Sequence, residues 1–356
     1  MKKTVKSVLG LCMAAALLSA SGCADTSWSF KSDYETLSNG IYIYYTYSAY
    51  TDAYSQVEDT SVSVLDQTVE DEDAETWILN KAEEECIAHL TMTRLINENN
   101  VEIDEDDLAT YEDYADSIYE YYFASSFEAL GVSEESYRKC TGTYSAYSEE
   151  LFKSIYDIGG TSEVSQDELE DYFTENYTYY TYFYLSLTTT DDDGETVDID
   201  DDERALMEAY FAEYKDMINT DGSTMDDVIA QYQEDYDTDD DPSVTNTAIL
   251  SETSLSEDLQ AQIEEMEEGT ADCIELDSYY YFIYKGNISD QLDTIADDSD
   301  DDEVISNRLS IVHDMKDDEY DEYLEEEKEN TEYEINDACI SKYTVQRVIN
   351  IINSLE

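Results

Sequence analysis

Proline, histidine and basic residues are all scarce in this sequence. Pro242 is the single proline, His89 and His313 are the two histidines, and 17 Lys and Arg stand against 90 Asp and Glu. The formal net charge of −73 excludes nucleic acid as a partner, because that binding depends on Lys and Arg contacts to phosphate. The same charge disfavours an orientation flat on anionic lipid.

Several motifs that carry chemistry are also missing. The sequence contains no GxSxG, P-loop or HExxH spacing, which argues against hydrolase, nucleotide-binding and zinc-protease functions. No pair of cysteines has CxxC spacing, and none lies beside a histidine in a zinc-binding pattern. We therefore expect no cofactor and no metal site.

Runs of Asp are the one feature that suggests a cation. They occupy residues 191–193, 198–202, 239–241 and 297–302. None of them has the Asp-x-Asp-x-Asp-Gly spacing that places oxygen ligands around Ca²⁺. Solvated loops are the simpler interpretation, and Ca²⁺ binding stays an open alternative.

Despite its acidity, the chain is predicted to fold. High net charge is typical of disorder when hydrophobic residues are few. Here hydrophobic residues make up 41% of the sequence and include 34 Tyr. Many recur at helical spacing, as Tyr47, Tyr50 and Tyr54 do. The length of 356 residues is enough for two or three domains.

The N-terminus has the parts of a secretory signal: a basic start, an apolar run from Val8 to Leu18, and small residues before Cys23. The apolar run is too short for a permanent membrane helix, which needs about 20 apolar residues. Ala20-Ser21-Gly22-Cys23 resembles the cleavage box of bacterial lipoproteins, whose cysteine carries the lipid. We expect a signal peptide over residues 1–22 and a lipid on Cys23 that anchors the protein to the extracytoplasmic face of the cell membrane. The alternative is an ordinary secretory signal with an incidental cysteine.

Four further cysteines follow in the chain, namely Cys86, Cys140, Cys273 and Cys339. Four cysteines allow three pairings, and sequence alone does not choose among them. Disulfides and free buried thiols are both compatible with this pattern.

The first half of the chain is predicted to be helical. Residues 23–33 read as a short polar tether, and residues 34–175 as the N-terminal part of a helical domain. Within that part, Trp77 to Asn99 carries an apolar face at helical spacing, and a second helix extends from Leu108 to about Leu130.

Serine residues indicate where further helices begin. Ser133 and Ser223 precede helical segments and can accept hydrogen bonds from their first amides. Ser165 with Glu168 has the spacing of a capping box.

The periodicity changes at residue 176. Tyr180, Tyr182 and Tyr184 alternate with Thr and Phe, which predicts a strand. The segment then continues with a polar loop over Asp191–Asp202, helices over Ala205–Ile218, Met225–Tyr232 and Leu255–Met266, and a hairpin over Cys273–Lys285. Long helical patterns resume at Val304. We predict a mainly helical α+β protein, in which residues 34–175 and 290–356 build one helical domain around an inserted unit over residues 176–289.

Five segments resemble the SurA and PrsA family of extracytoplasmic chaperones and foldases, and two of them are Asn39-Gly40 with the aromatic helix that follows and Leu79–Asp107. Phe127–Tyr137 is similar to a helix junction of that family, Val164–Asn176 to the lead into its isomerase strand, and Met225–Asp235 to a helix of its parvulin-type domain. The resemblance implies a chaperone domain, built from both ends of the chain, around an inserted parvulin-type peptidyl-prolyl isomerase domain. It also implies unfolded or extended exported polypeptides as partners.

The inserted segment departs from the family at its catalytic positions. Active parvulins carry a histidine in the first strand and usually another in the last, where this sequence has Tyr182 or Phe183 and then Phe282. The resemblance therefore implies a degenerate, inactive domain with no catalytic residues. Tyr182, Met225 and Phe282 are the candidate residues of its peptide groove, although core packing is the simpler role for each. His89 and His313 fall in helical flanks, where packing is again the simpler role.

Two other functions stay open at this point. An active peptidyl-prolyl isomerase remains possible without the histidines, because the reaction needs an apolar pocket that favours the twisted amide rather than covalent chemistry. A non-enzymatic surface lipoprotein could also use the same scaffold to bind a ligand or a partner. A proline-limited refolding assay and an aggregation assay with an unfolded client separate the three.

Overall fold

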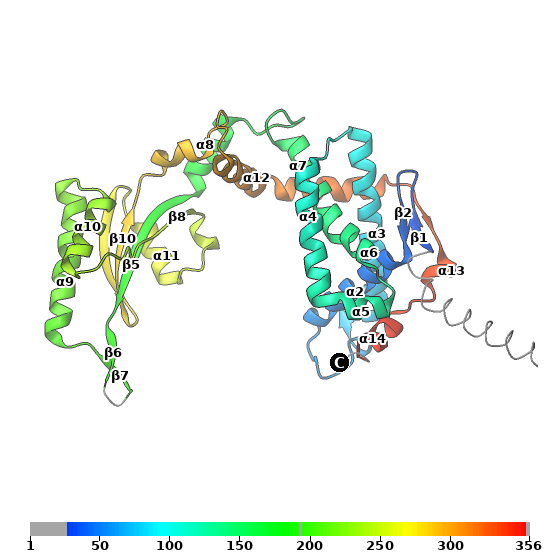
Figure 1. The fold of residues 1–356 in the computed structure, drawn as a ribbon, viewed down its shortest axis with the longest axis horizontal. Coiled ribbons are helices and arrows are strands. Elements are labelled where there is room, and N and C mark those ends of the chain that lie inside the picture. The colour runs from blue at the N-terminus through cyan, green and yellow to red at the C-terminus, as the bar shows by residue number, and fades with distance from the viewer. Residues whose placement is uncertain (1–26, 192–193, 354–356) are drawn as a thin grey trace, which may run out of the picture. The chain divides into compact units, whose positions relative to one another are not determined.

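The computed structural model describes residues 27–191 and 194–353 and has a mainly helical α+β architecture. The chain separates into two compact units, of which unit 1 comprises Met1–Glu163 and Lys316–Glu356 and unit 2 comprises Val164–Met315 (Figure 1). Over the described ranges, no helix is both long and apolar enough to span a membrane.

Unit 1 is built mainly from helices. Its elements are β1 (Trp28–Lys31), β2 (Thr36–Ser38), α2 (Asn39–Gln56), β3 (Thr68–Val69), β4 (Glu72–Asp73), α3 (Ala74–Asn99), α4 (Glu105–Ile118), α5 (Ala124–Leu130), α6 (Glu134–Arg138), α7 (Tyr144–Tyr156), the second part of α12 (Asp302–Glu329), β11 (Glu334–Ile335), α13 (Asp337–Ile340) and α14 (Val345–Asn353). Two π-helical turns, η2 (Tyr119–Phe123) and η3 (Lys139–Thr143), interrupt this series.

The two separated segments of unit 1 share one core. Strand β11, near the end of the chain, pairs antiparallel with β1, which pairs in turn with β2. In the interior, Val345 and Ile349 of α14 pack in one cluster with Ala49 and Ala53 of α2. The apolar face of α2 is therefore covered partly by residues from the far end of the sequence.

The prediction of a polar tether over residues 23–33 is wrong for its second half. Trp28–Lys31 forms β1, the central strand of the three-stranded sheet. Phe30 is fully buried and stacks against Tyr42 of α2 at a centroid distance of 6.0 Å. Four residues are too few for an alternating pattern to be distinguished from a loop, so the sequence lacked the signal.

Helix α3 (Ala74–Asn99) confirms the helix that apolar periodicity predicted from Trp77 to Asn99. The Asp73 carboxylate accepts a hydrogen bond from the Thr76 amide at the start, and Asn100 ends the helix in the left-handed conformation with φ 53°. The helix predicted over Leu108–Leu130 is instead broken into α4 and α5 by the π-helical turn η2. Apolar spacing cannot reveal one extra residue in a turn, so the break was not predicted.

Unit 2 contains the longer strands. Its elements are α8 (Gln166–Asn176), β5 (Thr178–Ser186), β6 (Thr188–Thr190), β7 (Thr196–Asp198), α9 (Asp201–Asp216), the π-helical turn η4 (Met217–Asp221), α10 (Met225–Asp235), β8 (Val244–Ala248), α11 (Glu257–Glu265), β9 (Thr270–Leu276), β10 (Tyr279–Lys285) and the first part of α12. The predicted range 176–289 includes the strands, while α8 and part of α12 also belong to this unit.

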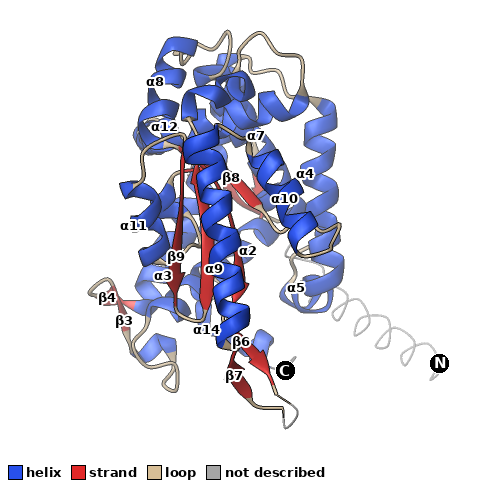
Figure 2. Ribbon diagram, turned by 90° about the vertical axis from the view of Figure 1, so that its left-hand side faces the viewer, coloured by secondary structure: helices blue, strands red, loops and turns tan. Residues whose placement is uncertain are grey.

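The main sheet of unit 2 has four antiparallel strands in the order β8-β5-β10-β9. Helices cover both faces, with α9 and α10 on one side and α11 on the other (Figure 1). Figure 2 shows α9 running along the strands. In the register of β5 with β10, Phe183 lies opposite Phe282 and Tyr182 opposite Ile283, so these two pairs point to opposite faces.

Two local predictions in unit 2 need correction. The segment predicted as a polar loop over Asp191–Asp202 contains the hairpin strand β7, which pairs with β6. The cap of α10 is Thr224, in a reciprocal capping box with Asp227, and not Ser223. Thr-x-x-Asp satisfies the amides of the first turn as Ser-x-x-Glu does.

Candidate functional site

The three residues predicted to line a peptide groove do not share one surface. Phe282 of β10 and Met225 of α10 belong to the cluster between the sheet and helices α9 and α10. Tyr182 of β5 packs on the opposite face, beside α11. The structure therefore brings Met225 and Phe282 together and separates both from Tyr182.

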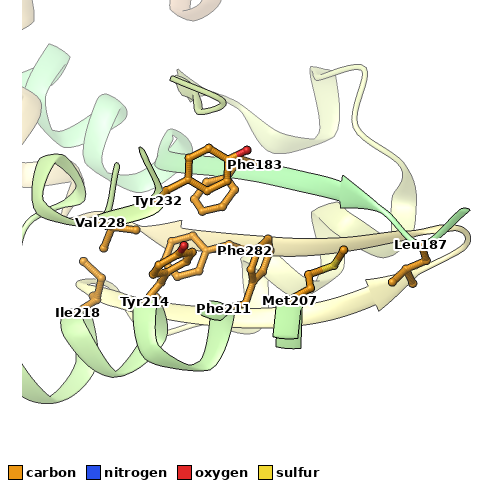
Figure 3. Close-up of a cluster of buried hydrophobic side chains, with 10 residues drawn as sticks. Phe183, Leu187, Met207, Phe211, Tyr214, Ile218, Val228, Tyr232 and Phe282 are labelled. Carbon is orange, nitrogen blue, oxygen red and sulfur yellow. The ribbon is translucent and has the colours of Figure 1, made fainter. Parts of the chain in front are cut away.

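Phe282 is a core residue. Its side chain is fully buried and stacks on Phe183 with centroids 5.0 Å apart, while Phe211 and Tyr214 of α9 meet the same pair of rings (Figure 3). Met225, at the first turn of α10, is half-buried at the margin of this cluster. No ligand can reach Phe282 without displacing α9. Phe282 therefore has the simpler of the two roles considered from the sequence, which is core packing.

The opposite face carries a group of partly exposed tyrosines, which we call the tyrosine cluster: Tyr182 and Tyr184 of β5 with Tyr279 and Tyr281 of β10. Helix α11 covers the neighbouring part of this face, where Leu259 and Ile263 pack against the sheet. The cluster lies beyond that cover, and 48% of Tyr184 and 39% of Tyr279 are exposed.

The four rings of the tyrosine cluster contact one another. Tyr184 lies 5.0 Å from Tyr279 and 5.2 Å from Tyr281 between ring centroids, and Tyr281 lies 6.4 Å from Tyr182. Such edge and tilted arrangements are favourable for aromatic pairs, so the rings support one another's positions. The result is a continuous aromatic surface held on a sheet rather than on a loop.

The cluster offers neutral hydroxyl groups beside apolar ring surface. Burial raises the pKa of both Tyr182 and Tyr281, and the neighbouring tyrosines raise it further. The phenols of these residues therefore stay protonated at neutral pH. A surface of this kind can take up apolar side chains and hydrogen-bond to a peptide backbone, but it supplies neither a base nor a nucleophile.

Neither histidine lies in the sheet of unit 2. His313 belongs to α12, and His89 belongs to α3 of unit 1. The positions compared with catalytic histidines hold Tyr182, Phe183 and Phe282, and the last two are fully buried. The geometry of this sheet therefore provides no imidazole near a prospective peptide.

His89 is part of a buried polar network that the sequence did not reveal. Its Nδ1 lies 3.0 Å from the hydroxyl of Tyr45, and its Nε2 lies 3.4 Å from the carboxylate of Glu35. The hydroxyl of Thr93 donates to the same carboxylate oxygen at 2.6 Å. Because Glu35 precedes β2 and His89 lies in the middle of α3, no local spacing relates them.

Electrostatics within this network fix the charge of Glu35. Burial raises the pKa of its carboxyl, but the hydrogen bonds from His89 and Thr93 and the nearby Lys139 ammonium outweigh burial and lower it to about 2. Burial raises the pKa of Tyr45 well above its usual range. The network links the loop before β2 to α2 and α3, which is a structural role.

The remaining candidate groups show no sign of a metal centre. Cys86, Cys140, Cys273 and Cys339 are free thiols. In residues 27–191 and 194–353, no three or more His, Cys, Asp or Glu side chains are grouped so that they could hold a metal ion. Cys23 lies outside the described residues.

Comparison with known proteins adds little to this geometry. No family model matches the sequence, and no curated protein does. Among solved structures, the chain is similar to the foldase protein PrsA from Streptococcus pneumoniae, with 11% identity, a TM-score of 0.27, and coverage of 78% of this chain and 85% of that one. At that TM-score the likeness does not establish a common fold, so the function has to be argued from the residues of this chain.

Proposed function

We propose that this protein is a lipid-anchored extracytoplasmic chaperone that binds unfolded exported polypeptides through the tyrosine cluster of unit 2. The observation that carries the proposal is the group of four mutually contacting tyrosines left partly uncovered beside α11. Aromatic surface that is exposed, contiguous and held on a sheet marks a site of interaction with apolar ligands.

The chemistry of the cluster suits clients of mixed sequence. Tyrosine provides a large apolar ring with few rotatable bonds and a polar tip, so it binds varied side chains at a low entropic cost. The net charge of −73 keeps the protein itself soluble while apolar surface is exposed. It also favours basic or neutral clients over acidic ones.

Unit 2 would then act as a parvulin-like domain that binds without catalysing isomerisation. Its four-stranded antiparallel sheet between helices is the architecture that this proposal requires, and the sheet carries no histidine. We expect the protein to leave the rate of a proline-limited refolding reaction unchanged. Acceleration of that reaction would instead favour an active peptidyl-prolyl isomerase.

An aggregation assay with a chemically unfolded client tests the proposal. The wild-type protein should suppress aggregation, and the double variant Tyr184→Ser/Tyr279→Ser should lose most of that effect because it removes the two most exposed rings of the cluster. The matched control is Tyr121→Ser/Tyr122→Ser, which removes two tyrosines that are 80% and 63% exposed in unit 1. Equal loss in both variants, or no suppression by the wild type, would rule out the cluster as the client site.

The anchor is a separate part of the proposal. Attachment through a lipid on Cys23 would hold the protein on the extracytoplasmic face of the membrane, since two or more acyl chains anchor stably where one does not. When cells are extracted with a detergent that separates from water on warming, we expect the full-length protein to partition into the detergent phase. The variant Cys23→Ala should not partition there, whereas an unchanged distribution would exclude lipidation at this residue.

A further inference from the structure

The two edges of the unit 2 sheet differ in whether their outward-facing backbone N–H and C=O groups already have hydrogen-bond partners. The sheet order places β8 at one edge and β9 at the other. An uncovered edge strand presents N–H and C=O groups that can pair with another extended chain. Proteins usually block such edges with side chains, helices or charges, so an edge left open is a candidate binding site.

The β9 edge is blocked by side chains from the helical segment beside it. The side-chain amide of Asn219 donates from Nδ2 to the Ala271 carbonyl and accepts at Oδ1 from the Ala271 N–H, both at 2.8 Å. It therefore takes the place that a neighbouring strand would occupy. Next to it, the Asp272 carboxylate accepts from the Cys273 N–H at 2.9 Å and pairs with Lys215 of α9 at 2.5 Å. No peptide can pair with β9 unless these contacts break.

The β8 edge has no comparable cover. Within the part of the chain that the structure describes, its ladder partner is β5 alone, and Val244, Thr245 and Asn246 are exposed. The side chains of this strand that form hydrogen bonds reach inward to β5: the hydroxyls of Thr245 and Thr181 share a hydrogen bond at 2.9 Å, and the Asn246 side chain bonds to that of Tyr180. The strand sequence Val-Thr-Asn-Thr-Ala contains no charged residue that would repel a pairing chain.

The open edge adjoins the tyrosine cluster. In the β5–β8 ladder, Val244 lies opposite Tyr182, which is the last residue of β5 that β8 pairs with. Strand β5 continues to Ser186, so Tyr184 lies beyond the start of β8. A chain added along β8 would therefore place its backbone against the edge and every second side chain on the face that carries the tyrosine cluster.

We propose that the β8 edge binds an extended, basic segment of a client polypeptide as an additional strand of the sheet. This inference deepens the proposed function and rests on it, because it assigns backbone pairing to the site whose side-chain surface is the tyrosine cluster. The charge of the bound segment follows from the run Asp239-Asp240-Asp241, which leads into β8. Backbone pairing also supplies affinity that does not depend on the side chains of the bound segment.

A second copy of this chain is the competing occupant of the edge. Each copy carries a net charge of −73, and like charges oppose the approach of two such chains. A basic segment gains attraction at the same place. Charge therefore favours the client segment, and the oligomeric state of the protein at assay concentration tests the alternative.

The test uses peptides that are methylated on the backbone. A fluorescent nine-residue probe alternating Val and Lys is compared with two derivatives, in which the N–H groups of the odd or of the even residues carry a methyl group. Only one set of N–H groups faces a pairing strand, because successive backbone groups alternate in direction. We expect one derivative to bind the full-length protein at least about tenfold more weakly than the probe and the other to bind as the probe does.

Each outcome bears on the proposal. If both derivatives bind as the probe does while Tyr184→Ser/Tyr279→Ser still weakens binding, strand addition is excluded and the proposed function stands. If the probe does not bind at all, the proposed function fails as well. If the protein is a dimer that dissociates on addition of the probe, a second copy occupies the edge in the free protein.

Hydrogen exchange gives an independent readout that needs no variant of the protein. Addition of the probe should slow exchange of amides in β8, while amides of β9 should be unchanged because Asn219 already occupies that edge. Slower exchange in β9 alone would overturn the assignment.

Discussion

The two units of this molecule are stabilised in different ways. Unit 1 unites two distant segments of the chain and contains a buried polar network around Glu35 and His89. Unit 2 is one continuous segment, and its main core is an aromatic layer between the sheet and helices α9 and α10. The comparison shows that a buried charged group adds to the apolar clusters of unit 1, whereas the core of unit 2 between the sheet and α9 and α10 is mainly aromatic. Four changes test that contrast.

The largest effect is expected in the aromatic layer of unit 2. Phe282→Ala should lower the free energy of unfolding of unit 2 by about 3–5 kcal/mol, because it leaves a cavity beneath Phe183 and Phe211. Hydrogen exchange followed by mass spectrometry reports the two units separately. The matched control is Tyr281→Ala, the preceding residue, which lies on the tyrosine cluster face and should cost far less. Equal costs would contradict the assignment of faces.

The next largest effect is a pH dependence confined to unit 1. Folding lowers the pKa of Glu35 from 4.5 to about 2. The stabilisation that the Glu35 carboxylate contributes to unit 1 is therefore complete above pH 4.5 and is lost as the pH falls toward 2. One pKa unit corresponds to about 1.4 kcal/mol, which makes the full effect up to about 3 kcal/mol. Glu35→Gln should remove it, so thermal unfolding of the variant and the wild type should differ at pH 6 and converge near pH 2.

Neutralisation of other carboxylates acts on both proteins alike, because the variant changes one of 90 acidic residues. The difference between the two unfolding curves therefore isolates Glu35. A constant difference at all pH values would mean that the charge of Glu35 makes no contribution.

A smaller effect is expected where two helical segments of unit 1 approach closely. A Cβ on Gly142 would lie 2.8 Å from the Tyr111 carbonyl oxygen and 3.0 Å from the Cα of Glu112. Gly142→Ala should therefore push η3 away from α4 and cost about 1–2 kcal/mol, after the gain in helix propensity is subtracted. Denaturant unfolding monitored in unit 1 checks this, and unit 2 serves as the internal control. Unchanged stability would show that α4 can shift without cost.

The smallest effect on stability is expected from the tyrosine cluster. Tyr184→Ser/Tyr279→Ser should change the free energy of unfolding of unit 2 by no more than about 1 kcal/mol, because both rings are substantially exposed. Thermal unfolding of the double variant checks this. A large loss of stability would mean that the rings serve the core, and the loss of client binding in the same variant would then have no bearing on a binding site.

Local signals in the sequence predicted the helices well. The apolar face from Ile78 to Leu90 and the capping box at Ser165 are properties of neighbouring residues, and both are found where expected. The alternation along β5 likewise predicted which of its residues share a face. These features depend on contacts within one element, which sequence spacing determines directly.

Contacts between elements could not be predicted in the same way. Which face Phe282 shares with β5 depends on strand register, and a shift of one residue reverses the answer. Phe282 was therefore grouped with Tyr182, although the structure places them on opposite sides of the sheet. The β1–β11 pair and the Glu35–His89 contact join residues far apart in the chain, and no pattern in a single sequence relates them.

The pairing of β11 with β1 has a consequence for the order in which the protein acquires its structure. Until the segment from Lys316 onward is available, strand β1 lacks its partner β11. The core of unit 1 then also lacks Val345 and Ile349 of α14. Unit 2 is contiguous, so all of its residues emerge from a ribosome or a translocation channel before the second segment of unit 1 does. Unit 2 can therefore fold first, while unit 1 exposes part of its interior until its second segment, from Lys316 onward, becomes available.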